Sequence, residues 1–381
     1  MAVVHKAFKY RIYPTDEQIT LLSKTFGCVR YIYNHFLEFK KTEYEKYESK
    51  YSYKDCSKLL TLLKQETEWL KEPDKCALQN SIKDLDSAFK NFFKGAGYPN
   101  FKSKHKSRDS YRTNCNIKIL DGFIQLPKLG KVKIKDKTLH PNGKLLSVTV
   151  SRTKTGKYFA SLLYENVIIE DLPKTGRSVG IDLGISKFIT TSDMYEVLNP
   201  KYLEAESLKL KKLNRSLSRK PNDSKNREKA RLKLAKCYEK IANQRKDFLH
   251  KLSRMIVEEY DLIVIEDLKV ENLLKNHKLA QSISSASWSS FVLMLQYKAS
   301  WYGKRVVKVD TFFPSSQLCN SCGYKNKEVK NLDIRGWECP VCGSYNHRDL
   351  NAAKNILNKG LEILEQEELI LKLIEVLKSQ L

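Results

Sequence analysis

Two closely spaced cysteine pairs limit the folds that the last third of this chain can adopt. Cys319 and Cys322 are separated by two residues, as are Cys339 and Cys342, and sixteen residues lie between the pairs. This is the spacing of a four-thiolate zinc ribbon, in which each pair grips the metal from a tight turn. Because the protein would supply all four ligands, we expect the zinc to be structural, with a redox pair as the smaller alternative.

The remaining cysteines follow no such pattern. The chain has nine cysteines, and an odd number argues against a framework built from disulfides alone. Five are scattered along the chain, and we predict that they are buried thiols that pack as small apolar side chains. These five are Cys28, Cys56, Cys76, Cys115 and Cys237.

The charge balance indicates the kind of partner. The 381 residues include 69 Lys and Arg against 44 Asp and Glu, a formal net charge of +25. Such an excess favours a polyanion, because each basic contact with a phosphate releases counterions. Nucleic acid is the first candidate and an anionic membrane the second, but no stretch approaches the roughly 20 apolar residues of a spanning helix. The first residues also lack the apolar core of a signal peptide, so we expect a cytoplasmic protein without a membrane partner.

Hydrophobic periodicity divides the first half of the chain into strands and helices. Residues 5–13 alternate as a strand does, whereas residues 15–94 have apolar positions at the helical spacing of three and four. Residues 115–168 return to a period of two and contain Asp-Gly and Thr-Gly turns. We predict a small β-barrel or sheet that the first strand joins, which makes the helices an insertion.

Basic segments supply candidate contacts to nucleic acid. Residues 201–254 read as a helical pair with eighteen Lys or Arg against six acids, which favours an arm that binds a backbone over a merely solvated face. Residues 94–112 interleave basic and aromatic side chains, a pattern that suits a solvated linker and a nucleic-acid groove equally well. A third group, Lys75, Gln79 and Lys83, shares one helix face at a spacing of four. An ordinary polar face is the plainer interpretation of this group. The candidates are Lys75, Gln79, Lys83, Lys102, Lys104, Arg108 and Arg112.

A glycine-flanked aspartate stands out in the strand over residues 178–188. Ile181, Leu183 and Ile185 would line one face, while Asp182 shares the other face with two glycines. A lone buried charge costs several kcal/mol unless it is paired or bound to a metal. We interpret the glycines as making room for a hydrated cation and a phosphate.

Two further carboxylates fit the same site. Glu266 ends a short apolar strand over residues 261–268, and Asp349 lies near the start of a helix. Taken singly, Glu266 could be a solvent-facing strand end and Asp349 a helix cap. Together with Asp182 they predict the two-metal geometry of phosphodiester cleavage, with Mg²⁺ or Mn²⁺ on hard oxygen ligands. We expect the neighbouring Asp267 to point to the opposite face.

The order of these motifs resembles the transposon-encoded TnpB nucleases, which are relatives of the type V CRISPR effectors. The matching segments are "GIDLGI", "IVIEDL", "PSSQLCNSCG", "WECPVCG" and "NHRDLNAAKNIL", with "KAFKYRIYPTDEQITLLSKTFGCVRYIYNHFL" and "GYPNFKSK" nearer the start. The resemblance therefore runs nearly end to end. One departure is in the last motif, where the family often has His-Asp-Arg-Asp and this chain has Asn346-His347-Arg348-Asp349.

The resemblance implies an α/β multidomain fold. A RuvC-type, RNase H-like nuclease domain would contain an inserted zinc ribbon, and a β-barrel wedge domain would be interrupted by a helical recognition domain. The implied boundaries are 1–14 and 104–175 for the wedge, 15–103 for the helices, 176–313 and 345–360 for the nuclease domain, 314–344 for the ribbon and 361–381 for an acidic C-terminal helix.

The resemblance also implies a function and its partners. An RNA-guided DNA endonuclease of this kind takes a guide RNA from the transposon end and cuts double-stranded DNA next to a short target-adjacent motif. Asp182, Glu266 and Asp349 would be its catalytic, magnesium-binding triad. We expect a monomer with one RNA, cytoplasmic in a prokaryote and associated with the nucleoid when it acts. The alternatives are a miniature type V CRISPR effector and a protein-only RNase H-like resolvase or transposase.

Overall fold

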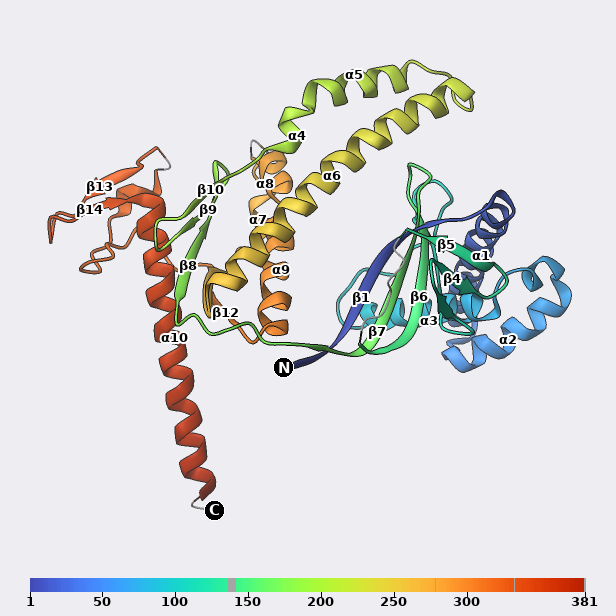
Figure 1. Cartoon of the computed structure of the whole chain (residues 1–381), viewed down its shortest axis with the longest axis horizontal. Coiled ribbons are helices and arrows are strands. Elements are labelled where there is room, and N and C mark those ends of the chain that lie inside the picture. Colours follow the sequence, from blue (N-terminus) through green and yellow to red (C-terminus); the bar gives the residue numbers. More distant parts are fainter. Residues whose placement is uncertain (136–141, 278, 332, 380–381) are drawn as a thin grey trace. The chain divides into compact units, whose positions relative to one another are not determined.

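A computed structural model describes residues 1–135, 142–277, 279–331 and 333–379 of the chain. It divides into two compact units, one over Val3–Ile168 and one over Ile169–Leu381 together with the first two residues. Figure 1 shows a sheet with its own helices in each unit. No helix in the described ranges has the length and apolar character needed to span a bilayer.

The N-terminal unit is built on a seven-stranded sheet in the order β2-β6-β7-β1-β5-β4-β3. The first strand therefore joins the later ones, as its alternation predicts. The end strands β2 and β3 do not pair with each other in the described residues, so barrel closure stays a prediction. The strands are β1 (Ala2–Tyr13), β2 (Asp109–Thr113), β3 (Lys118–Leu120), β4 (Phe123–Leu126), β5 (Gly130–Ile134), β6 (Lys144–Arg152) and β7 (Tyr158–Ile169).

The helices of this unit lie between β1 and β2 in the chain. The first begins at a capping box, in which the Thr15 hydroxyl accepts from the Gln18 amide while the Gln18 side chain accepts from the Thr15 amide. They are α1 (Asp16–Tyr47), α2 (Tyr53–Glu66), the 3₁₀ turn η1 (Glu68–Lys71) and α3 (Lys75–Phe92).

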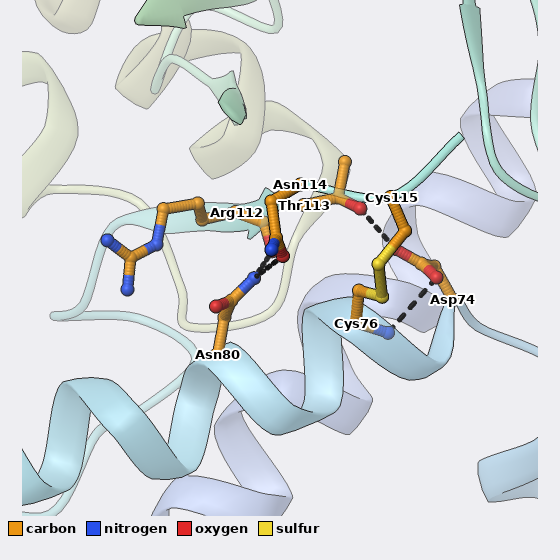
Figure 2. Close-up of a disulfide and its surroundings, with 7 residues drawn as sticks. All are labelled: Asp74, Cys76, Asn80, Arg112, Thr113, Asn114 and Cys115. Atoms are coloured by element: carbon orange, nitrogen blue, oxygen red, sulfur yellow. Dashed lines mark hydrogen bonds between the residues drawn. A yellow bond between two sulfur atoms is a disulfide. The ribbon is translucent and has the colours of Figure 1, made fainter. Parts of the chain in front are cut away.

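Two of the five scattered cysteines are not thiols, which corrects the sequence-based prediction. Cys76 in the first turn of α3 and Cys115 just after β2 form a disulfide, with their Cα atoms 6.4 Å apart (Figure 2). Asp74 helps to bring them together, because it accepts hydrogen bonds from the Cys76 amide and the Thr113 hydroxyl. Pairing depends on this long-range contact rather than on sequence spacing. The prediction of buried free cysteines is confirmed for the other three, Cys28, Cys56 and Cys237.

The C-terminal unit contains a mixed five-stranded sheet in the order β10-β9-β8-β11-β12. The central strand β11 is parallel to β8 and to β12, while β9 is antiparallel to β8 and to β10. The strands are β8 (Ser178–Leu183), β9 (Lys187–Thr191), β10 (Glu196–Leu198), β11 (Leu262–Glu266) and β12 (Arg305–Val309).

Helices cover both faces of this sheet. Ile263 and Ile265 of β11 point into a core with α6 (Lys225–Glu259) and α9 (Trp288–Trp301). Val264 lies on the opposite face, in a core that includes Ile356 of α10 (Arg348–Ser379). In Figure 1, α10 runs along β8 on the side away from α6 and α9.

The last helix differs from the expected arrangement. The sequence predicts a separate acidic helix over 361–381, but α10 is continuous from Arg348 to Ser379, and its last two predicted residues lie outside the described ranges. Gly360 lies within this continuous helix, at a position where a Cβ would lie 2.4 Å from the Val264 side chain. This glycine therefore lets α10 approach β11 closely.

The predicted basic helical pair is present as α5 (Ser207–Ser218) and α6. Its seam is formed by Leu210 from α5 and by Cys237 and Ile241 from α6, all buried. Because the basic side chains surround this narrow apolar seam, the pair presents charge along most of its length. The remaining elements are α4 (Tyr202–Ala205), α7 (Val270–Leu273), α8 (Ala280–Ala286), η2 (Lys327–Lys330), β13 (Gly336–Glu338) and β14 (Tyr345–His347).

Candidate active site and zinc site

The carboxyl ends of two neighbouring parallel strands bring Asp182 and Glu266 to one edge of the sheet. Ile181 of β8 is in register with Ile265 of β11, and each acid is the next residue along its strand. Since side chains alternate along a strand, Asp182 shares the face of Gly180, and Glu266 shares the face of Val264. This is the face that α10 covers.

Gly180 sets the position of the third acid. A Cβ at Gly180 would lie 2.1 Å from the Ala353 carbonyl oxygen of α10, so only glycine permits this contact. Asp349 precedes Ala353 by four residues, about one helical turn. It therefore lies near Asp182, which is two residues beyond Gly180 in β8.

The flanking glycines do not make room for a ligand, which corrects the sequence-based interpretation. The space beside Gly180 is filled by the α10 backbone, with Ala353 and Leu357 as neighbours. A Cβ at Gly184 would instead meet the Lys187 carbonyl oxygen at 2.6 Å, within the turn that follows β8. Both glycines are required by close backbone approach.

The three acids influence one another electrostatically. The pKa of Asp182 is raised from 3.8 to about 8, first by burial and then by the negative charges of Glu266 and Asp349. Arg348 opposes this rise. Burial also raises the pKa of Glu266, and a hydrogen bond from Ser315 opposes it. Carboxylates that repel one another in an enclosed place fit a bound cation, because its charge would favour their ionised forms.

The acids are more widely spaced than the zinc ligands. Within the described ranges, the cysteines form the one group of His, Cys, Asp or Glu ligand atoms that all lie within 4.8 Å of one another. Asp349 also faces Arg335, whose guanidinium nitrogen lies 3.7 Å from its carboxylate.

Asp267 is turned away from these acids. Its carboxylate forms ion pairs with Lys269 and Lys308, and hydrogen bonds from both lysines lower its pKa. Adjacent residues of a strand point to opposite faces, so the neighbour of Glu266 serves a different contact.

The four predicted zinc ligands form one cluster. Cys319 Sγ lies 3.7 Å from Cys342 Sγ, and Cys322 Sγ lies 3.6 Å from Cys339 Sγ. Thiolates around a tetrahedral zinc with bonds of about 2.3 Å would be separated by about 3.8 Å. These residues therefore fit a structural zinc ion.

Asn346, the first residue of the last motif, contacts this cysteine cluster. Asn346 is buried and donates from Nδ2 to Cys319 Sγ, 3.5 Å away, and to the Ser344 carbonyl oxygen. Such a donor stabilises a thiolate ligand. His347, which stands where the family often has an acid, is exposed.

Six of the seven predicted nucleic-acid contacts fall into two groups in the N-terminal unit. Lys75, Gln79 and Lys83 lie on the outer side of α3, where both lysines are exposed. Lys102, Arg108 and Arg112 line a cavity of about 420 Å³. Lys104 is exposed and does not line this cavity.

A fourth basic side chain, which the sequence did not indicate, also lines the cavity. Arg30 of α1 lines it together with the aromatic rings of Phe26 and Tyr111. A single arginine in an amphipathic helix carries no signal, since only the fold brings it beside Arg108 and Arg112. Asp84 also lines the cavity and pairs with Arg112 at 2.7 Å.

Known proteins match nearly the whole chain. A Streptomyces pristinaespiralis protein named as an RNA-guided DNA endonuclease is 43% identical over 367 residues, which cover 95% of this chain and 90% of the relative. The chain belongs to the TnpB (IS605 OrfB) family. Another TnpB-family relative, InsQ of Escherichia coli (strain K12), carries the same functional name and is 32% identical over 387 residues, covering 96% of this chain and 94% of InsQ.

Family profiles match three segments of this TnpB-family chain. The OrfB_IS605 profile, described as "Probable transposase", matches residues 150–277, and the "Cas12f1-like, TNB domain" profile matches residues 288–356. A profile described as a "Helix-turn-helix domain" matches residues 1–49, where the structure has β1 followed by the single long helix α1. A solved Cas12f1–sgRNA–target DNA complex aligns over 93% of this chain and 99% of its own at 17% identity, but its TM-score of 0.37 is too low to define the fold.

Proposed function

We propose that this chain is an RNA-guided DNA endonuclease of a transposable element. It cuts double-stranded DNA next to a short target-adjacent motif by hydrolysing phosphodiester bonds. The observation that carries the proposal is the gathering of Asp182, Glu266 and Asp349 on one face at the carboxyl edge of a sheet. The names of the full-length relatives support it.

The three acids act as ligands for divalent cations, Mg²⁺ or Mn²⁺. Bound there, such ions supply a Lewis acid and an activated water for in-line attack on a phosphate. Asp182 contributes a carboxylate from the centre of the site, Glu266 one from the adjacent strand and Asp349 one from α10. Burial and then the negative charges of Glu266 and Asp349 raise the pKa of Asp182, and a bound cation would offset both effects.

The domain arrangement follows from the same proposal. Residues 176–313 and 345–360 form a RuvC-type, RNase H-like nuclease domain, and residues 314–344 form its structural zinc ribbon. The wedge domain comprises residues 1–14 and 104–175, and it is interrupted by the helical recognition domain over 15–103. The mixed sheet with helices on both faces and the cysteine cluster support this division.

Guide RNA and target DNA are the proposed partners, and the excess of positive charge supports a polyanionic partner. The basic pair α5–α6 and the cationic cavity offer sites for backbone phosphates. The exposed face of α3, with Lys75, Gln79 and Lys83, is the proposed contact to the target-adjacent motif. One chain binds one RNA.

Sequencing the RNA that copurifies with the protein tests this function. The gene is expressed with its flanking DNA, and the full-length protein is purified under conditions that keep bound RNA. A discrete transcript that ends in a variable segment beyond the element's edge is the expected result, and a target matching that segment should be cut in Mg²⁺. A spread of unrelated cellular RNA, or cutting by Asp182→Ala at the wild-type rate, would contradict the proposal.

A further inference from the structure

A buried polar cluster joins the first cysteine pair to the helix that carries Asp349. Asn351 of α10 donates from Nδ2 to the Leu318 carbonyl oxygen, 2.6 Å away, and accepts from the Asn320 amide at 3.0 Å. Leu318 and Asn320 flank Cys319 in the chain. Asn351 therefore forms hydrogen bonds with the backbone on both sides of Cys319, a predicted zinc ligand.

One turn further along α10, Asn355 extends this grip toward the acids. Its Nδ2 donates to the Leu318 carbonyl oxygen at 2.7 Å and to the Ser315 carbonyl oxygen at 2.8 Å. Asn351 and Asn355 are only 3% and 6% exposed. Buried amides are costly unless they are hydrogen-bonded, so these contacts fix the segment from Ser315 to Asn320 against α10.

Ser315 connects the segment to the proposed active site. Its hydroxyl donates to Oε1 of Glu266 at 2.5 Å, and the side chain is almost fully buried. Within the described ranges, this is the one hydrogen bond to the Glu266 carboxylate. It restricts the rotation of the Glu266 side chain and leaves Oε2 available to a cation.

We propose that Ser315 is a positioning residue for Glu266, and that Asn355 holds Ser315 in place from α10. Leu318, Asn355 and Ser315 thereby connect the zinc ribbon to Glu266. This inference rests on the proposed function, because it assigns Glu266 to a divalent-cation site. It concerns how the acid is oriented and not which ion it binds.

Removal of the Ser315 hydroxyl tests the inference. Mn²⁺ binding is measured by isothermal titration calorimetry on the full-length chain after nucleic acid has been removed with high salt. Residues that orient a metal ligand typically change affinity by 10–100-fold. Ser315→Ala should therefore weaken Mn²⁺ binding by about tenfold, whereas Ser315→Thr keeps a hydroxyl and should restore most of the affinity.

Two further variants separate positioning from general damage. Asn355→Asp keeps the shape of the side chain but removes both donations, so it should weaken Mn²⁺ binding while the zinc content measured by plasma mass spectrometry stays at the wild-type level. Ser218→Ala removes a serine hydroxyl that bonds only within α5 and should leave Mn²⁺ affinity unchanged.

The outcomes distinguish the inference from the function on which it rests. Asp182→Ala should abolish Mn²⁺ binding, and if it binds Mn²⁺ as wild type does, the proposed acid site itself is wrong. If Asp182→Ala loses Mn²⁺ but Ser315→Ala binds it within twofold of wild type, the acid site stands and the positioning role of Ser315 is overturned. Should Asn355→Asp fold poorly, the Ser315→Ala and Ser315→Thr pair still decides.

Discussion

Gly180 of β8 lies so close to α10 that a methyl group in its place would stand 2.1 Å from the Ala353 carbonyl oxygen. Real Cβ atoms do not approach backbone oxygens this closely, and a helix backbone cannot move locally without moving its neighbours. The contact therefore fixes the distance between the strand that carries Asp182 and the helix that carries Asp349.

Gly180→Ala should push α10 away from β8. We expect a loss of stability of about 1–3 kcal/mol, as for other overpacked positions, and a fall in DNA cutting because Asp349 moves away from Asp182. Calorimetric melting and single-turnover cutting by the guide-loaded protein measure the two effects. Gly27→Ala is the matched control, since nothing lies within 4 Å of a Cβ there and α1 should gain about 0.5–1 kcal/mol. A Gly180→Ala protein that melts and cuts like wild type would rule out this role.

The strand pattern predicted that Asp182 lies in a strand but misjudged its glycines. Alternation along residues 178–188 assigns Asp182 and Gly180 to one face, and β8 has both residues on that face. The pattern cannot reveal what fills the space beside Gly180, because Ala353 lies far along the chain. A glycine required by a backbone contact and one required by a ligand look identical in the sequence.

The disulfide between Cys76 and Cys115 should stabilise the N-terminal unit. The two cysteines are 39 residues apart in the sequence. In the chain-entropy model, closing a loop of this length stabilises the folded state by about 4 kcal/mol. Reduction with dithiothreitol, or Cys115→Ser, should lower the melting temperature of this unit in calorimetry.

The control for this experiment is built into the variant. Dithiothreitol should have no further effect on Cys115→Ser, since the bond is already absent. Intact-mass spectrometry after alkylation under non-reducing conditions counts the free thiols. Alkylation of Cys76 in the folded wild-type protein without reductant would show that the pair is not bonded.

Loss of one predicted zinc ligand should impair DNA cutting, because the ribbon is held against α10, the helix that carries Asp349. Cys339→Ser removes one of four thiolates, so the zinc content should fall and the ribbon should loosen from α10. Cys237→Ser is the control, because Cys237 is a buried cysteine in the α5–α6 seam outside the cluster. Unchanged zinc content in Cys339→Ser would exclude that residue as a ligand.

The basic arm should make nucleic-acid binding sensitive to salt. Lys211, Lys212 and Arg215 are exposed on α5, and each contact with a phosphate should contribute close to one unit to the slope of log affinity against log salt. Changing all three to Ala should flatten the slope for guide RNA by about two to three units.

The matched control for the arm keeps its charge. The triple variant Lys211→Arg, Lys212→Arg and Arg215→Lys should have the wild-type slope. Filter binding at four salt concentrations provides both slopes. A neutralised arm with the wild-type slope would mean that α5 does not contact the RNA backbone.

Sequence reasoning located the acids but could not find what orients them. Glu266 and Asp349 follow from a strand end and a helix start, and both are local patterns. Ser315 and Asn355 give no local signal, because a serine after Pro314 and an asparagine within a helix are common. Their role depends on contacts between residues that are distant in the chain. The same holds for Arg30, which lines the cavity beside Arg108 and Arg112 only in the folded chain.

Glu266 and its neighbour Asp267 test directly whether the three acids form the nuclease site. They are adjacent in the chain, yet Glu266 faces the other two acids while Asp267 pairs with Lys269 and Lys308. The measurement is the single-turnover rate of target cutting in Mg²⁺ by guide-loaded Glu266→Gln and Asp267→Asn. We expect Glu266→Gln to lose cutting by a factor of about a hundred or more, on the order of a lost ion ligand, while it still binds the target. Asp267→Asn should cut like wild type. Equal cutting by Glu266→Gln and wild type would contradict the assignment of this site.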